Sequence, residues 1–157
     1  MTLNQIRSHR PCQDGWVKLL KYVNKNQPDD EPLHLSTVLD SNGLDDAIWC
    51  LRAEPTPERI QRFALAVARR VQHLHPQAKA TLDIVERYLA GQATTAELDT
   101  AADKAYAVNA PYAATCCTAY AVNASDAAAS ATRCAAANAL DAAEREAQAQ
   151  IFKEIFA

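Results

Sequence analysis

The stretch that most restricts the fold of this chain is residues 40–52, which combine a glycine, three carboxylates, a tryptophan and a cysteine. Gly43 can adopt the positive φ that ends one helix. Asp45 and Asp46 then fall in the first turn of a following helix, where carboxylates complement the positive end of the helix dipole. The stretch therefore predicts two helices that meet at a fixed corner.

The apolar side chains of this stretch recur at a helical period. Leu44, Ile48 and Leu51 share one helical face, and Trp49 is expected to widen the surface that this face buries. We therefore interpret the glycine, the carboxylates and the tryptophan of this stretch as residues that shape the backbone and the core, and not as catalytic residues. The predicted structural corner consists of Asp40, Gly43, Asp45, Asp46 and Trp49.

Helical patterns also run through the rest of the chain, which is 49% apolar but only 6% aromatic. Thr56 and Pro57 fit an N-cap and a first helical position, and an apolar stripe follows them to about residue 74. Thr94 and Glu97 fit a capping box, and further helices are predicted over 14–23 and 77–89. Residues 1–13 look like a short polar lead-in. We predict an all-α, compact multi-helix bundle of about six to eight helices.

The last third of the chain is rich in alanine, which fills 22 of the 49 positions from 101 to 149. Residues 105–110 recur as 119–124, an offset close to four helical turns. The repeat indicates either close helix packing or a contact surface formed by Tyr106 and Tyr120. We therefore divide the chain into a helical domain, 1–98, and a helical extension packed on it, 99–157, whose apolar end seals the bundle or meets a partner.

Charge and cysteine usage exclude several classes of function. The formal net charge of −3 does not favour general binding to nucleic acid or to anionic membranes. The five cysteines lack metal-ligand spacing, so reduced thiols are expected, and no signal peptide or membrane-spanning run is evident. A cytoplasmic protein without a cofactor is predicted.

Two groups of acidic residues have both a structural and a functional interpretation. Asp40, Asp45 and Asp46 serve as caps and first-turn acids, or they hold a hard cation and, with His73, act as acid and base. The segment Asp29-Asp30-Glu31 lies in a proline-flanked loop, where it is simply solvated or meets a basic partner.

Several motifs resemble a bacterial and phage-borne family of immunity proteins. The similarity covers roughly residues 6–98 in order and includes the segments 7–12, 15–16, 19–20, 28–33, 39–52, 62–64, 68–69, 71–74, 86–88 and 91–94. The resemblance implies a non-enzymatic protein that neutralises a toxin by binding it. Relatives interleave Trp and Arg in their alanine-rich tails, whereas this chain has Tyr, Thr and Cys there.

Three hypotheses about function follow. The first is an inhibitor in bacterial or phage–host conflict that occludes a partner's working surface, the partner being a toxin or a CRISPR-Cas complex bound by an anti-CRISPR protein. For it, the predicted contacts are Asp29, Asp30, Glu31, Tyr106 and Tyr120. The second is a metal-dependent enzyme built on Asp40, Asp45, Asp46 and His73. The third is a structural oligomer, such as a homodimer, held together by the tail.

Overall fold

The computed structural model describes residues 1–70, 72–74, 76–107 and 142–157. In these ranges the chain forms eight α-helices and no strand, which confirms the expected compact all-α fold. The helices are α1 (Leu3–Ser8), α2 (Gln13–Tyr22), α3 (Leu35–Asn42), α4 (Leu44–Cys50), α5 (Pro57–Arg70), α6 (Lys79–Leu89), α7 (Thr95–Ala107) and α10 (Ala142–Phe156). Short 3-10 turns cover Leu51–Ala53, Gln72–Leu74 and Pro76–Ala78.

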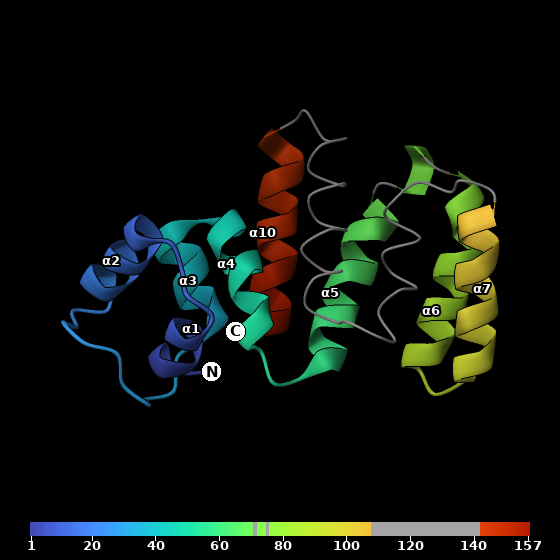
Figure 1. The fold of residues 1–157 in the computed structure, drawn as a ribbon. Helices are drawn as coiled ribbons and strands as arrows, with labels where there is room; N and C mark the ends of the chain where they lie inside the picture. Colours follow the sequence, from blue (N-terminus) through green and yellow to red (C-terminus); the bar gives the residue numbers. More distant parts are fainter. Residues whose placement is uncertain (71, 75, 108–141) are drawn as a thin grey trace.

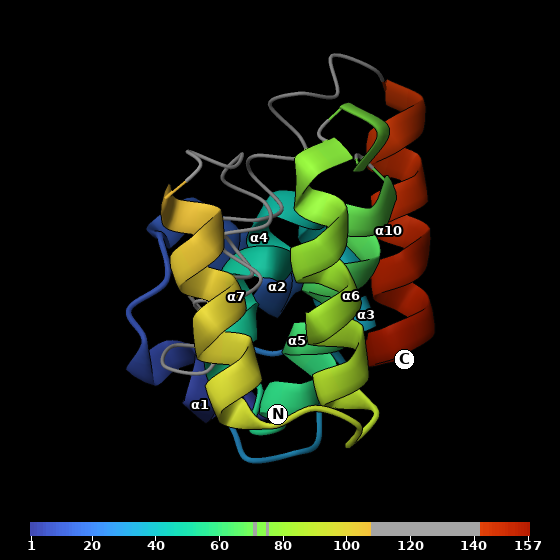
Figure 2. The ribbon, with the colours of Figure 1, turned by 90° about the vertical axis from the view of Figure 1, so that its right-hand side faces the viewer.

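The helices stand roughly in a row, with α1 to α4 at one end and α6 and α7 at the other (Figure 1). The last helix, α10, lies between these groups and packs on α3, α4 and α5. In turn α5 contacts α6, and α6 pairs with α7, side by side also in the second view (Figure 2). The chain's C-terminal helix therefore joins its N-terminal helices to α5.

A cluster of three phenylalanines holds α10 in place. Phe63 of α5 makes edge-to-face contacts with Phe152 and Phe156 of α10, with ring centroids 5.2 and 5.9 Å apart. All three side chains are fully buried, and such pairs add to the stabilisation from burying their apolar area. Of the two roles expected for the apolar end of the chain, Phe152 and Phe156 therefore perform the first, sealing the bundle.

The predicted corner is present between α3 and α4. Gly43 has φ 97°, a conformation that side-chain-bearing residues rarely adopt, and it separates the two helices. Asp45 and Asp46 occupy the first turn of α4 as expected. The capping box at Thr94 and Glu97 also forms, with each residue's side chain bonded to the other's backbone N–H.

One local prediction was wrong: residues 1–13 are not a polar lead-in. Thr2 and Gln5 form a capping box that opens α1, which buries Leu3 and Ile6 at 1% exposure each. Such a short helix contributes only two apolar side chains, which is too few for a periodic pattern to emerge. The helix predicted to reach about residue 74 also ends early, at Arg70, where a 3-10 turn follows.

Candidate functional site

The three carboxylates of the corner have separate partners. Asp40 pairs with Lys153 and Asp45 pairs with Arg145, each at 2.7 Å, so both attach the corner to α10. Asp46 instead accepts a hydrogen bond of 2.7 Å from Asn42. Because these partners point the carboxylates at different groups, the corner does not assemble them around one cation.

His73, which the second hypothesis groups with these acids, also has a partner of its own. The ring Nδ1 of His73 lies 3.0 Å from the carbonyl oxygen of Arg70, at the end of α5. Within the described ranges, no three His, Cys, Asp or Glu side chains come close enough to hold a metal ion. The contacts that Asp40, Asp45 and Asp46 do make are of the kind that their structural interpretation requires.

Asn42 connects α2 to the corner. Its Nδ2 group donates to the carbonyl oxygen of Gly15 in α2, at 2.8 Å, as well as to Asp46. Ser41 in turn donates to the Oδ1 atom of Asn42, at 2.7 Å. Gly15 permits this close approach, because a Cβ atom there would lie 2.7 Å from Oδ2 of Asp46 and 3.1 Å from Sγ of Cys12, and a side chain would have to move.

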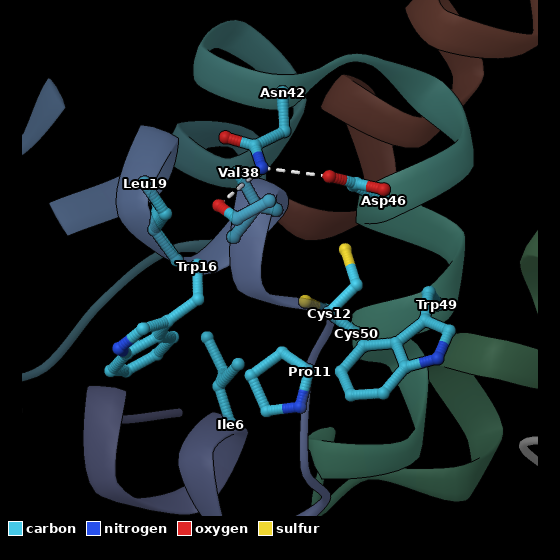
Figure 3. A pocket seen from close by; sticks show the side chains of 11 residues that line it. Ile6, Pro11, Cys12, Trp16, Leu19, Val38, Asn42, Asp46, Trp49 and Cys50 are labelled. Carbon is cyan, nitrogen blue, oxygen red and sulfur yellow. Dashed lines mark hydrogen bonds between the residues drawn. The ribbon is translucent and has the colours of Figure 1, made fainter. Parts of the chain in front are cut away.

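Beside this crossing, α1, α2, α3 and α4 enclose a mostly apolar pocket of about 100 Å³ (Figure 3). The pair Asn42 and Asp46 forms one end of it, and Ile6 and Pro11 lie toward the other. Its remaining lining comes from Cys12, Gly15, Trp16, Leu19, Val38, Trp49 and Cys50. Both tryptophans of the chain therefore line this one pocket.

The two tryptophans differ in burial, and each lies beside an arginine. Trp16 is buried at 6% exposure, with the guanidinium of Arg7 5.3 Å from its ring centroid. Trp49 is only partly buried, and the guanidinium of Arg52 lies 4.3 Å from its ring centroid. The expectation that Trp49 is a core residue was therefore correct only in part: one side packs on the core and the rest faces the pocket and Arg52.

Two thiols line the pocket as well, and they differ in reactivity. Cys12 is exposed, whereas Cys50 is buried. Burial raises the pKa of the Cys50 thiol to about 12, and the negative charge of Asp46 adds to this effect, while Arg52 opposes it. Because the thiolate is the nucleophile, Cys50 is inert near neutral pH, which leaves Cys12 as the accessible thiol of the pocket.

The acidic loop Asp29-Asp30-Glu31 folds back on the N-terminus. The backbone N–H of Asn4 donates to the carbonyl oxygen of Asp29 at 3.1 Å, which fixes the loop against α1. Lys25 contacts both Asp29 and Glu31, at 2.5 and 2.6 Å. Its hydrogen bond to Asp29 lowers the pKa of that carboxyl group. Among the residues that the structure describes, Asp30 has one long contact, in which the Thr2 hydroxyl donates to its Oδ1 atom at 3.4 Å.

Of the two other predicted contact residues, Tyr106 lies within the described part of the chain and Tyr120 does not. Tyr106 lies in the last turn of α7, and the joint contact surface of the two residues stays a prediction. The arginines of α5 mostly pair, Arg69 with Asp83 and Glu86 and Arg70 with Glu144.

Sequence reasoning missed the pocket and the roles of Gly15 and Asn42. The available signals were a glycine inside an otherwise helical pattern and two tryptophans far apart in sequence, neither of which indicates a shared site by itself. No family of known proteins, no curated protein and no solved structure matches the chain. Among the helices described, none has both the length and the apolar character needed to span a bilayer.

Proposed function

We propose that the protein is a non-enzymatic, protein-binding inhibitor that acts by covering a partner's working surface, as the resemblance to immunity proteins implies. The partner would be a toxin or a CRISPR-Cas complex, and direct binding to nucleic acid is not part of the proposal. Homodimer formation and a cytoplasmic location are compatible with it.

The observation that carries the proposal is the anchored acidic loop. Its backbone is fixed at both ends, by the bond from Asn4 to Asp29 and by a 2.8 Å bond from Leu33 N–H to the carbonyl oxygen of Met1. Asp30 and Glu31 are exposed, and Lys25 compensates only part of the loop's charge. A preorganised acidic surface loses little entropy on binding and attracts a basic partner from a distance.

The competing enzymatic hypothesis has less support from the geometry. The acids on which it depends, Asp40, Asp45 and Asp46, are engaged with Lys153, Arg145 and Asn42. These pairs connect helices to each other, which is what a structural role requires. In the loop, Asp29 and Glu31 pair with the nearby Lys25, and the side chains of Asp30 and Glu31 are exposed.

The proposal is tested by capture from a lysate of the native host, using the immobilised wild-type protein and two charge variants. The variant Asp30→Lys/Glu31→Lys reverses the charge of two loop residues. The control variant Asp99→Lys/Asp103→Lys makes the same change in charge at two exposed acids of α7. We expect one dominant partner, a toxin or a CRISPR surveillance complex. Its association rate should fall on the order of tenfold with the loop variant and stay near wild type with the α7 variant.

Two results would count against the proposal. If the wild type captures no protein in near-stoichiometric amount, an inhibitor that works by binding is not supported. If a partner is captured but both variants associate at the wild-type rate, the acidic loop is not the contact. Size-exclusion chromatography and circular dichroism of each variant show whether the fold is retained.

A further inference from the structure

The pocket between α1, α2, α3 and α4 has a volume that suits a single side chain. It encloses about 100 Å³, whereas sites for drug-sized ligands measure roughly 300–1,000 Å³. An engineered apolar cavity of about 150 Å³ takes up benzene, so this space suits a single aliphatic or small aromatic group. Its walls are chiefly apolar, and Asp46, the one charged group among them, is already bonded to Asn42.

The charge beside the pocket is positive. Arg7 and Arg52 lie against the rings of Trp16 and Trp49, and Arg10 directly precedes Pro11, which also lines the pocket. Among the described residues, none of these three arginines forms an ion pair. Other arginines of the chain do: Arg59, Arg69, Arg70, Arg87 and Arg145 each contact a carboxylate.

We propose that this pocket binds one large apolar side chain from an acidic segment of a partner protein, with the segment's carboxylates paired to Arg7, Arg10 and Arg52. At the centre of a protein interface, an apolar anchor usually occupies a well-packed pocket whose surrounding contacts exclude water, and the rim of the interface is polar. Arginine and tryptophan, which supply the walls and rim, are the residues most enriched at such centres.

The pocket and the acidic loop lie near opposite ends of α1. The loop is bonded to Thr2 and Asn4 at the start of this helix, and Arg7 lies in its last turn. The inference rests on the proposed function in taking the ligand to be a protein, and it adds a second contact of opposite charge. A partner that matches both would present a basic surface next to an acidic segment with an apolar anchor.

The experiment is a selection from a random peptide display library against the full-length wild-type protein. Peptides with one large apolar residue flanked by Asp or Glu should be enriched. Their binding is followed by tryptophan fluorescence, because both tryptophans of the chain line the pocket.

Two pairs of variants test the assignment of the site. Cys12→Phe adds a large ring to the wall of the pocket, and Val17→Phe adds the same ring at an exposed position of α2 outside the pocket lining. Arg7→Glu/Arg52→Glu reverses the rim, and Arg62→Glu reverses an exposed arginine on α5. We expect at least a tenfold loss of peptide affinity with Cys12→Phe and with the rim variant, and little change with either control.

Several outcomes would overturn the inference: no enrichment, enrichment of basic or wholly polar peptides, or full binding by Cys12→Phe in a folded protein. If Cys12→Phe does not fold, the rim variant decides, and unchanged affinity there refutes the proposal. The proposed function is judged separately. A host partner whose binding depends on the acidic loop but not on Cys12→Phe leaves that function standing and removes this inference alone.

Discussion

Gly15→Ala tests the close approach of α2 to the corner, because helix propensity and packing predict opposite signs for it. Alanine is favoured over glycine inside a helix by about 0.8–1 kcal/mol, so on propensity alone the change stabilises. In this structure, however, the new Cβ would lie 2.7 Å from Oδ2 of Asp46, a distance that Cβ atoms do not tolerate. The carboxylate must therefore move.

The cost of that movement comes from the hydrogen bond that it breaks. Oδ2 of Asp46 accepts from Nδ2 of Asn42 at 2.7 Å, and a hydrogen bond to a charged group contributes about 1.5–3 kcal/mol. Subtracting the gain in helix propensity leaves a net destabilisation of about 0.5–2 kcal/mol. Part of the strain also falls on Cys12, whose Sγ would be 3.1 Å from the new methyl group.

A double-mutant cycle with Asp46→Ala isolates this interaction. Once the carboxylate is removed, Gly15→Ala should become neutral or stabilising by up to about 1 kcal/mol. The two changes should therefore couple by about 0.5–3 kcal/mol, measured by urea unfolding followed by far-ultraviolet circular dichroism. Gly91→Ala is the control. It should destabilise the protein because Gly91 has a positive φ of 70°, but a Cβ atom there would meet no atom within 4 Å. Its effect should therefore not couple to Asp46.

If Gly15→Ala stabilises the wild-type protein as much as it stabilises Asp46→Ala, the new Cβ does not displace the Asp46 carboxylate. Additive effects at the two positions would mean that α2 does not approach Asp46 as closely as described. The hydrogen bonds of Asn42 would then not be what holds α2 on the corner.

Three further predictions concern burial and ionisation. Phe152→Ala should lower the free energy of unfolding by about 3–5 kcal/mol in denaturant melts, because Phe152 is fully buried. Trp49→Ala should lower it distinctly less, because Trp49 is only partly buried. Equal losses would contradict this difference in burial. Folding raises the pKa of the Cys50 thiol from near 9 to about 12. Below about pH 9 the thiol is protonated in both the folded and the unfolded state, so it does not reduce the free energy of unfolding. Above that pH the unfolded state loses this proton first, and the free energy of unfolding falls by up to about 1.4 kcal/mol per pH unit. Stability should therefore decline more steeply above pH ~9 in the wild type than in Cys50→Ala, and parallel declines would exclude this linkage. Lys25→Ala should raise the pKa of Asp29 towards its ordinary value in an NMR titration, whereas an unchanged pKa would show that the Lys25 contact does not form in solution.

Much of the fold could be predicted from the sequence because its signals are local. Gly43, with the acids that follow it, marks a helix boundary that depends only on backbone conformation and the helix dipole. Pro57 and the capping box at Thr94 likewise fix where α5 and α7 begin. Predictions of this kind hold because nothing distant is needed to satisfy them.

The candidate site was harder to predict because its parts come from four helices. Trp16 and Trp49 share a pocket only after α2 packs on α3 and α4, and that packing depends on the missing side chain at Gly15. The partners of Asp40 and Asp45 lie on α10, roughly a hundred residues along the chain. Periodicity identifies the face of a helix that is buried, but it does not identify the residues that this face will meet.

We propose that the protein acts by binding another protein through the region around α1. Hydrogen–deuterium exchange of the protein, free and in complex with the partner captured from its host, shows whether this region is the contact. We expect slower exchange on binding in residues 1–16, 28–33 and 44–52, which include the acidic loop and the arginine-flanked pocket. Protection confined to α7 or α10, with these segments unchanged, would contradict it.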